Sequence, residues 1–339
     1  MKRLIWEGGA NFRFVEAAIP KLLSLDQVLV RATAVGICGT DVHIMEGRLR
    51  IARPPIVLGH EIAGVVVEVG GGVKKAKVGD RVTVDPVIGC GKCFFCRRGS
   101  RQFCKDGFEL GITADGGDQN FLVVPQENVH VLPPSISDEA GAILDMEMWG
   151  AFTKCGIKHG ETVVVIGPGP AGMVACQVAK ILGAEGVILV GPTGARMKAA
   201  EELGLADAYV FTDRGSIVDA IAAETRGLGA HVTIECAGTS GALTTALTCV
   251  RPGGRVVLYG VHTQPFQSFD VNSIALRDLV VFGSLSDRQG WEKVIELVSS
   301  GKLRLDPLVT HRFAFEDAPE AYDFVRRGSD GLIKAVIVL

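Results

Sequence analysis

Short apolar runs separated by turns fill about the first 130 residues of the chain. Three of these runs are rich in β-branched residues: Gln27–Ala34, Ile62–Val69 and Arg81–Val84. The tetrapeptide Val78-Gly-Asp-Arg forms a turn between the last two, and glycine and proline interrupt the runs repeatedly. This pattern is typical of short, irregular strands. It predicts a β-rich first domain.

The pattern changes to a helical period after this domain. Ser137 precedes Asp138 and Glu139, and apolar residues then recur at helical spacing over Ala140–Ala151. A serine caps the free backbone amides at a helix start, and acids favour the first turn. The pattern therefore predicts one helix that starts after Ser137.

From residue 161 on, short apolar runs alternate with helical patterns. This alternation predicts a parallel, doubly wound six-stranded sheet, the Rossmann architecture of α/β proteins. The predicted strands are Thr162–Ile166, Val187–Val190, Ala208–Phe211, His231–Glu235, Arg255–Tyr259 and Leu279–Phe282. The predicted helices include Ala171–Leu182, Ala195–Leu203 and Ser216–Thr225. After about residue 285 the alternation ends, and Ile333–Leu339 predicts a final strand.

A glycine-rich turn follows the first strand of this sheet. It reads Gly167-Pro-Gly169-Pro170-Ala171-Gly172 and opens a helix. In this position the motif predicts a dinucleotide site, because its glycines allow a tight turn, close approach of the pyrophosphate and close helix–strand packing. The helix N-terminus presents free amides to the phosphates.

The end of the second strand lacks the acid that would bind the ribose 2′-hydroxyl of NAD. Gly191 occupies that place, and Thr193 and Arg196 follow within reach of a 2′-phosphate. Arg196 is equally compatible with an exposed helix position. The sequence therefore predicts NAD or NADP as the cofactor and leaves the choice between them open.

Composition narrows the class of protein. The chain has 339 residues, enough for two domains, with 47% hydrophobic and 22% charged residues and a net charge of −3. The acidic balance argues against a nucleic-acid or membrane partner, and no apolar stretch approaches the ~18 residues of a membrane span. An odd count of nine cysteines and no export signal predict a cytoplasmic protein without disulfides.

Four of these cysteines fall within one short segment, at the spacing C-x2-C-x2-C-x7-C. They are Cys90, Cys93, Cys96 and Cys104. Once disulfides are excluded, the spacing is open to a nucleic-acid-binding zinc finger or a structural metal lobe. Upstream lie Cys38, His60 and Glu61, all competent zinc ligands. By themselves they do not establish a metal site.

Several motifs together resemble the zinc-dependent medium-chain dehydrogenases, the family of alcohol, sorbitol and threonine dehydrogenases. They are GICGTDVH, LGHEIAGVVVEVG, VGDRV, the four-cysteine segment and VIGPGPAG. The resemblance implies a GroES-like β-rich catalytic domain over residues 1–148, completed by residues 286–339. A Rossmann domain over residues 149–285 is then inserted between them. Within this frame four thiolates form a closed structural zinc site, because no position remains for substrate.

The resemblance also implies a catalytic zinc. Cys38 and His60 are expected as ligands, Glu61 as a ligand that exchanges with water or substrate, and Asp145 as the last ligand. Glu147 is an alternative to Asp145 as the last ligand. Residues two apart on a helix point to different faces, however, so Glu147 is expected to point away from the face that carries Asp145. Trp149 is expected either in the substrate pocket wall or in the core.

The activity implied is interconversion of a secondary alcohol or polyol with its ketone, by hydride transfer to or from NAD(P). A proton relay is expected from the alcohol through Thr40 and the cofactor ribose to His43, because a histidine titrates near neutrality. The alternatives are a zinc-free quinone or enoyl reductase and a non-catalytic dinucleotide sensor. The family also implies a homodimer or homotetramer.

Overall fold

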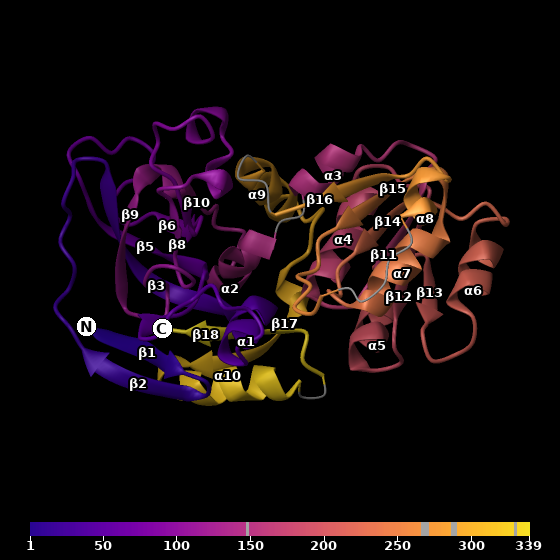
Figure 1. Ribbon diagram of the computed structural model, residues 1–339. Helices are drawn as coiled ribbons and strands as arrows, with labels where there is room; N and C mark the ends of the chain where they lie inside the picture. Colours follow the sequence, from indigo (N-terminus) through magenta and orange to yellow (C-terminus); the bar gives the residue numbers. More distant parts are fainter. Residues whose placement is uncertain (147–148, 266–270, 286–289, 329–330) are drawn as a thin grey trace. The chain divides into compact units, whose positions relative to one another are not determined.

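The computed structural model describes residues 1–146, 149–265, 271–285, 290–328 and 331–339. The chain divides into two compact units (Figure 1). The first unit comprises Met1–Asp145 and Trp291–Leu339, and the second comprises Met146–Gly290. The second unit is thus inserted into the sequence of the first. No helix in the described ranges is long and apolar enough to cross a membrane.

Seven strands form the main sheet of the first unit, in the order β10-β6-β5-β3-β18-β17, with β9 also paired to β3. The strands are β3 (Gln27–Ile37), β5 (Glu61–Val69), β6 (Arg81–Val84), β9 (Phe121–Pro125), β10 (Val129–Val131), β17 (Val309–Ala314) and β18 (Lys334–Val338). Strand β18 pairs antiparallel with β3, so the end of the chain completes a sheet begun near its start (Figure 1).

Smaller elements surround this sheet. Strands β1 (Lys2–Gly8), β2 (Asn11–Glu16) and β4 (Ile56–Val57) form a three-stranded sheet, and β7 (Val87–Ile88) pairs with β8 (Phe108–Glu109). The helices are α1 (Gly39–Met45), α2 (Asp138–Ala142), α9 (Trp291–Ser299) and α10 (Ala318–Arg327). One apolar cluster gathers around the main sheet, and a second joins β1, α1 and α10.

The second unit contains one parallel sheet of six strands, in the order β13-β12-β11-β14-β15-β16. The strands are β11 (Thr162–Ile166), β12 (Gly186–Gly191), β13 (Ala208–Phe211), β14 (Ala230–Glu235), β15 (Val250–Leu258) and β16 (Val280–Gly283). The helices are α3 (Trp149–Cys155), α4 (Pro170–Ile181), α5 (Ala195–Glu202), α6 (Ile217–Glu224), α7 (Ser240–Cys249) and α8 (Asn272–Ala275).

The central strands of this sheet are apolar because both of their faces are buried. Val163, Val164 and Val165 follow one another in β11, and each is fully buried. Successive strand residues point to opposite faces, so a continuous apolar run requires cover on both sides. The predicted α/β fold, with a six-stranded parallel sheet and a β-rich domain, is confirmed.

The single helix predicted over Ala140–Ala151 is wrong. The helix α2 ends at Ala142, a 3₁₀ turn covers Ile143–Met146, and α3 begins at Trp149. Ile143 and Leu144 are both buried, so packing of adjacent side chains replaces the helical period here. The predicted cap is confirmed, since Ser137 Oγ accepts a hydrogen bond of 3.0 Å from the Ala140 amide.

Candidate zinc centres and dinucleotide site

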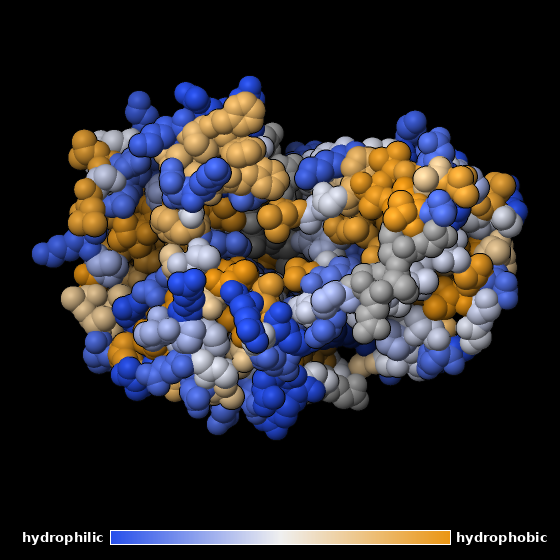
Figure 2. All heavy atoms as spheres, in the orientation of Figure 1, coloured by the Kyte–Doolittle hydropathy of each residue, from blue (hydrophilic) through white to orange (hydrophobic). Residues whose placement is uncertain are grey.

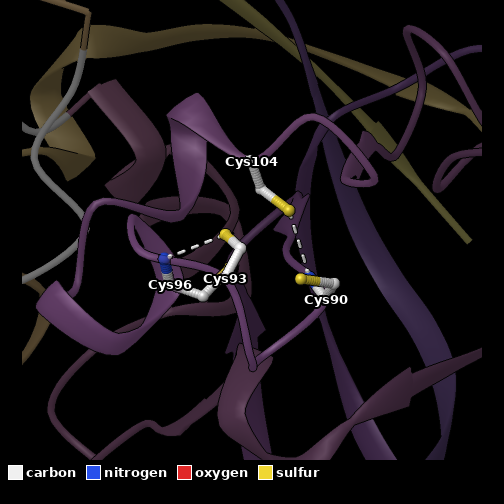
Figure 3. A group of neighbouring side chains, drawn as sticks. All are labelled: Cys90, Cys93, Cys96 and Cys104. Carbon is white, nitrogen blue, oxygen red and sulfur yellow. Dashed lines mark hydrogen bonds between the residues drawn. The ribbon is translucent and has the colours of Figure 1, made fainter.

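The four thiols of the segment 90–104 lie together in the first unit. Their sulfur atoms are all within 4.8 Å of one another (Figure 3). Zinc–thiolate bonds of about 2.3 Å would place the sulfurs of a tetrahedral site roughly 3.8 Å apart, so the group fits a zinc ion. Two amides point into it: Cys90 N donates to Cys104 Sγ and Cys96 N to Cys93 Sγ, each at 3.4 Å.

The surroundings of the lobe shift the pKa values of two of its thiols in opposite directions. Backbone amides, first that of Lys92, lower the pKa of the Cys90 thiol to about 7. Burial raises the pKa of Cys96 to about 12. Thiolates are the metal-binding form, so zinc binding releases the protons that remain. With four protein ligands the centre is closed and structural.

A buried ion pair attaches the lobe to the main sheet. Arg101, in the 3₁₀ turn Arg101–Phe103, donates to the fully buried carboxylate of Asp85. Asn128 Nδ2 donates to the carbonyl oxygens of Asp85 and Val87 at 2.8 and 2.9 Å. Arg101, a basic residue of this segment, therefore has a structural partner within the first unit.

A second group of ligands lies where β3 and β5 meet. Metal-binding atoms of Cys38, His60 and Glu61 are within 4.8 Å of one another. Cys38 follows β3 and is the N-cap residue of α1, while Glu61 is the first residue of β5. The pairing of Gly36 with Glu61 brings the two strands into register at this point. The three ligand types and their spacing fit zinc with a position left for a further ligand.

A buried carboxylate orients His60. Asp41 Oδ1 lies 3.3 Å from His60 Nδ1, and Asp41 Oδ2 accepts a 2.8 Å hydrogen bond from the Cys38 amide. A carboxylate at Nδ1 favours the tautomer with the proton there, which leaves Nε2 available to a metal. Asp41 therefore positions both a histidine and a cysteine ligand.

Lys334 is the counter-ion of Glu61. Its Nζ lies 2.6 Å from Glu61 Oε1, and both side chains are nearly inaccessible. Burial lowers the pKa of Lys334, but the charges of Glu61, Cys38 and Asp41 and the hydrogen bond to Glu61 together raise it above its ordinary value. Glu61 Oε2 is buried and has no hydrogen-bond partner among the residues that the structure describes, as expected of an oxygen that awaits a metal ion. Sequence reasoning missed this lysine, although a single charge in the apolar run Ile333–Leu339 was the available signal.

The other expected residues near this group are only partly described. The backbone of Asp145 lies in the 3₁₀ turn Ile143–Met146, but its side chain, like residue Glu147, lies outside the described residues. Trp149 begins α3 in the second unit. The roles of Asp145 and Trp149 remain predictions.

Helix α1 carries the two residues expected in proton transfer. The Thr40 hydroxyl is 3.7 Å from Cys38 Sγ. His43 lies three residues further on, on the same side of the helix, and is half-buried with Nδ1 lacking a hydrogen-bond partner among the described residues. Burial, and then the charge of Arg48, lower the pKa of His43 from its ordinary value of 6.5.

The glycine-rich turn has the geometry that its sequence predicts. Gly167 has a φ of +110°, and a Cβ on Gly172 would lie 1.9 Å from the Gly167 carbonyl oxygen. The helix α4 begins at Pro170 with Gly169 as its N-cap and Ala171 in its first turn. The turn therefore presents the free amides of a long helix at the carboxyl end of β11.

The residues expected at the adenosine end lie between β12 and α5. Gly191 ends β12 and is buried, and the Thr193 amide and hydroxyl both donate to Asp213. A cavity of about 410 Å³ opens beside them, lined by Thr193, Gly194, Lys198, Glu201, Phe211 and Arg214. Arg196 is exposed on α5 and is not among the lining residues.

The Lys334–Glu61 pair predicts a large stability effect. We expect Lys334→Met to lower the free energy of unfolding by about 3–5 kcal/mol, because it leaves Glu61 buried without a counter-ion. Chemical denaturation of the purified protein measures this. The double variant with Glu61→Gln should recover part of the loss, since it removes the uncompensated charge.

Lys293→Met is the matched control. Lys293 pairs with Glu296 at 2.9 Å on the surface, with both side chains well exposed. An exposed pair contributes about 0–1 kcal/mol. Similar losses in the two lysine variants would contradict the importance assigned to the buried pair.

Comparison with known proteins agrees with this geometry. Residues 24–134 match the model of the alcohol dehydrogenase GroES-like domain, and residues 170–300 match that of the zinc-binding dehydrogenases. Two curated relatives are an L-threonine 3-dehydrogenase of Pyrococcus abyssi and a sorbitol dehydrogenase of Halalkalibacterium halodurans. The first is 37% identical over 329 residues, covering 94% of this chain and 93% of the relative. The second is 34% identical over 308 residues, covering 89% of each.

A solved structure is similar over the whole length. It is a zinc-binding dehydrogenase of Sinorhizobium meliloti 1021 bound to NADP, with 32% identity and a TM-score of 0.91, covering 100% of this chain and 99% of that one. The ligand group Cys38–His60–Glu61 and the family matches argue against the zinc-free reductase. The chain belongs to the zinc-containing medium-chain alcohol dehydrogenase family and is a zinc-dependent NAD(P) dehydrogenase acting on CH–OH donors, with a structural and a catalytic zinc site.

Proposed function

We propose that the protein oxidises a small polar secondary alcohol, of the polyol or hydroxy-amino-acid type, to its ketone and catalyses the reverse reduction. The Cys38–His60–Glu61 group carries this proposal, because it leaves room for a substrate oxygen beside the metal. The relatives named for threonine and sorbitol support a substrate with a polar group near the reacting carbon.

The chain's residues have distinct parts in this reaction. Zinc, held by Cys38, His60 and the proposed ligand Asp145, with Glu61 as the ligand that exchanges for water or substrate, would supply a Lewis acid that lowers the pKa of the alcohol hydroxyl. A bound nicotinamide would accept the hydride from the alcohol carbon, and the hydroxyl proton would leave separately through the protein. Thr40 lies at hydrogen-bonding distance from Cys38. Its hydroxyl oxygen receives the proton of the alcohol, and the hydroxyl then donates its own proton to the next group of the relay.

His43 is the proposed exit of the proton to solvent. Its pKa lies below the ordinary 6.5 because of burial, so the ring is neutral at pH 7 and able to accept a proton. Its position one helical turn after Thr40 in α1 supports this role. In the reduction direction the same residue supplies the proton that the new hydroxyl requires.

We assign residues 149–285 to the dinucleotide domain, and residues 1–148 with 286–339 to the catalytic domain. Gly167, Gly169 and Gly172 allow the pyrophosphate to approach the start of α4, where Pro170 and Ala171 form its first turn. Gly191, Thr193 and Arg196 are proposed at the adenosine ribose, at the carboxyl end of β12.

We also propose a cytoplasmic homodimer or homotetramer. All nine cysteines are free thiols, as is usual in a reducing compartment. Strand β16 is an edge strand of the second unit's sheet, and Val271, Leu276 and Val280 nearby expose much of their apolar surface. Figure 2 shows apolar atoms gathered over the β15–α8 part of this unit. An unpaired strand edge beside an apolar surface favours association.

Separate substitutions distinguish the two zinc centres. We expect Cys38→Ser to abolish turnover while the free energy of unfolding stays nearly unchanged. Cys93→Ser should lower that free energy by about 2 kcal/mol or more, because the lobe depends on its metal for a fold. Equal stability in the two variants would contradict the division into a catalytic and a structural centre.

The relay is tested by Thr40→Val and His43→Gln. Each should reduce kcat by about 100-fold, the lower range for loss of a proton-transfer group. In the wild type, kcat for oxidation should fall as the pH drops below the pKa of His43, since the protonated ring accepts no proton. His43→Gln should abolish this acid limb. His159→Gln, an exposed histidine of the second unit, is the control and should keep it.

The proposed assembly is tested by light scattering after size exclusion. Leu276→Glu, at a site 83% exposed, should lower the mass toward that of a single chain. Leu228→Glu, at a site 65% exposed on the α6 side of the same unit, is the control and should leave the mass unchanged. A wild-type mass of one chain would refute the proposed assembly.

A further inference from the structure

The end of β12 excludes an acid at position 191. A Cβ built on Gly191 would lie 2.6 Å from both Cγ and Cδ of Pro168, and 3.1 Å from Met197 Sδ. Ring atoms of a proline cannot rotate away as the end of a flexible side chain does. Pro168 in turn lies between Gly167 and Gly169, the first two glycines of the phosphate turn. The residue that most often binds the ribose hydroxyls therefore has no space here.

A carboxylate approaches the same place from the neighbouring strand. Gly191 is the register partner of Phe211 at the end of β13, and the Thr212 amide donates to the Gly191 carbonyl at 2.9 Å. The next residue is Asp213. Its Oδ1 accepts hydrogen bonds from the Thr193 amide at 3.0 Å and the Thr193 hydroxyl at 2.9 Å. The side chain of Asp213 is thus held against the turn that follows β12.

Asp213 is exposed and negatively charged. The Thr193 amide, then the Thr193 hydroxyl, lower its pKa from the ordinary value of 3.8. Both bonds from Thr193 go to Oδ1, which leaves Oδ2 of this exposed side chain accessible to a further donor. An ionised carboxylate with an available oxygen is an acceptor for a hydroxyl donor.

The cations of the adjacent cavity already have partners. Arg214 lies over the ring of Phe211, with its guanidinium carbon 4.0 Å from the ring centroid. Lys198 lies 3.7 Å from Glu202 on the same helix. Glu201 also lines the cavity. Three basic residues at this end of the sheet, Lys198, Arg196 and Arg214, are matched in number by three acidic ones, Glu201, Glu202 and Asp213, so there is no excess of positive charge to favour a dianionic phosphate.

We propose that Asp213, held by Thr193, replaces the acid that Pro168 excludes from position 191 and selects the dinucleotide whose ribose carries a free 2′-hydroxyl. This inference rests on the proposed function, because it assumes that a nicotinamide dinucleotide lies along this sheet. The carboxylate accepts a hydrogen bond from the hydroxyl and repels a phosphate at the same carbon. NAD is then the preferred cofactor.

The test is a titration of the full-length protein with NADH and with NADPH, followed by the fluorescence of the bound dinucleotide. The wild type should bind NADH at least about tenfold more tightly, since a hydrogen bond to a charged group is worth that factor or more. Asp213→Asn keeps the size of the side chain and removes its charge. It should weaken NADH binding, strengthen NADPH binding and reduce the preference about tenfold or more.

Two further variants separate the hydrogen bond that holds Asp213 from a general effect of surface charge. Thr193→Val removes one of the bonds that hold Asp213 and should reduce the preference in the same direction by less. Asp219→Asn, an exposed acid on α6, is the control and should leave both affinities unchanged. Tighter NADPH binding by the wild type, or an unchanged preference in Asp213→Asn, overturns the inference alone. A wild type that binds neither dinucleotide overturns the proposed function as well.

Discussion

The register of β3 against its two neighbours determines where the catalytic ligands lie. Gly36 pairs with Glu61 of β5 on one side and with Val336 of β18 on the other. It has no side chain because a Cβ there would be 2.0 Å from Glu61 Oε2. Two residues later β3 gives way to α1, and Cys38 stands at that junction. A shift of one residue would turn Glu61 to the opposite face of the sheet and separate the group.

The two zinc centres use opposite physical designs. The four-cysteine lobe takes all its ligands from one short segment, and the metal supplies cohesion that such a segment cannot gain from an apolar core. The catalytic group takes its ligands from the ends of two strands, Cys38 after β3 and His60 and Glu61 at the start of β5, and the pairing of these strands holds them. Its cost is a set of buried carboxylates: Lys334 pairs with Glu61, and Asp41 lies against His60 Nδ1.

Features that depend on local sequence were predictable. The spacing of Cys90, Cys93, Cys96 and Cys104 places four ligands in one loop, and the turn Gly167–Gly172 follows a strand and opens a helix. Both signals need only neighbouring residues. The alternation of apolar strands and helices gave the order of elements in the second unit for the same reason.

Features that depend on strand order were not predictable. Lys334 is 273 residues from Glu61, and nothing in the sequence states that β18 lies beside β3. Likewise Asp213 follows a different strand from Gly191, and only the pairing of β13 with β12 brings them together. The break in the helix after Ala142 follows from burial of Ile143 and Leu144, which a helical period alone does not reveal.

Metal analysis tests the central claim, two zinc centres of different design, most directly. Mass spectrometry of the purified protein should find two zinc ions per chain. A mild chelator should then remove one of them together with all turnover, while circular dichroism shows that the fold persists, because only the open centre exchanges its ligands readily. One zinc per fully active chain, or turnover that survives removal of the exchangeable zinc, would contradict the account.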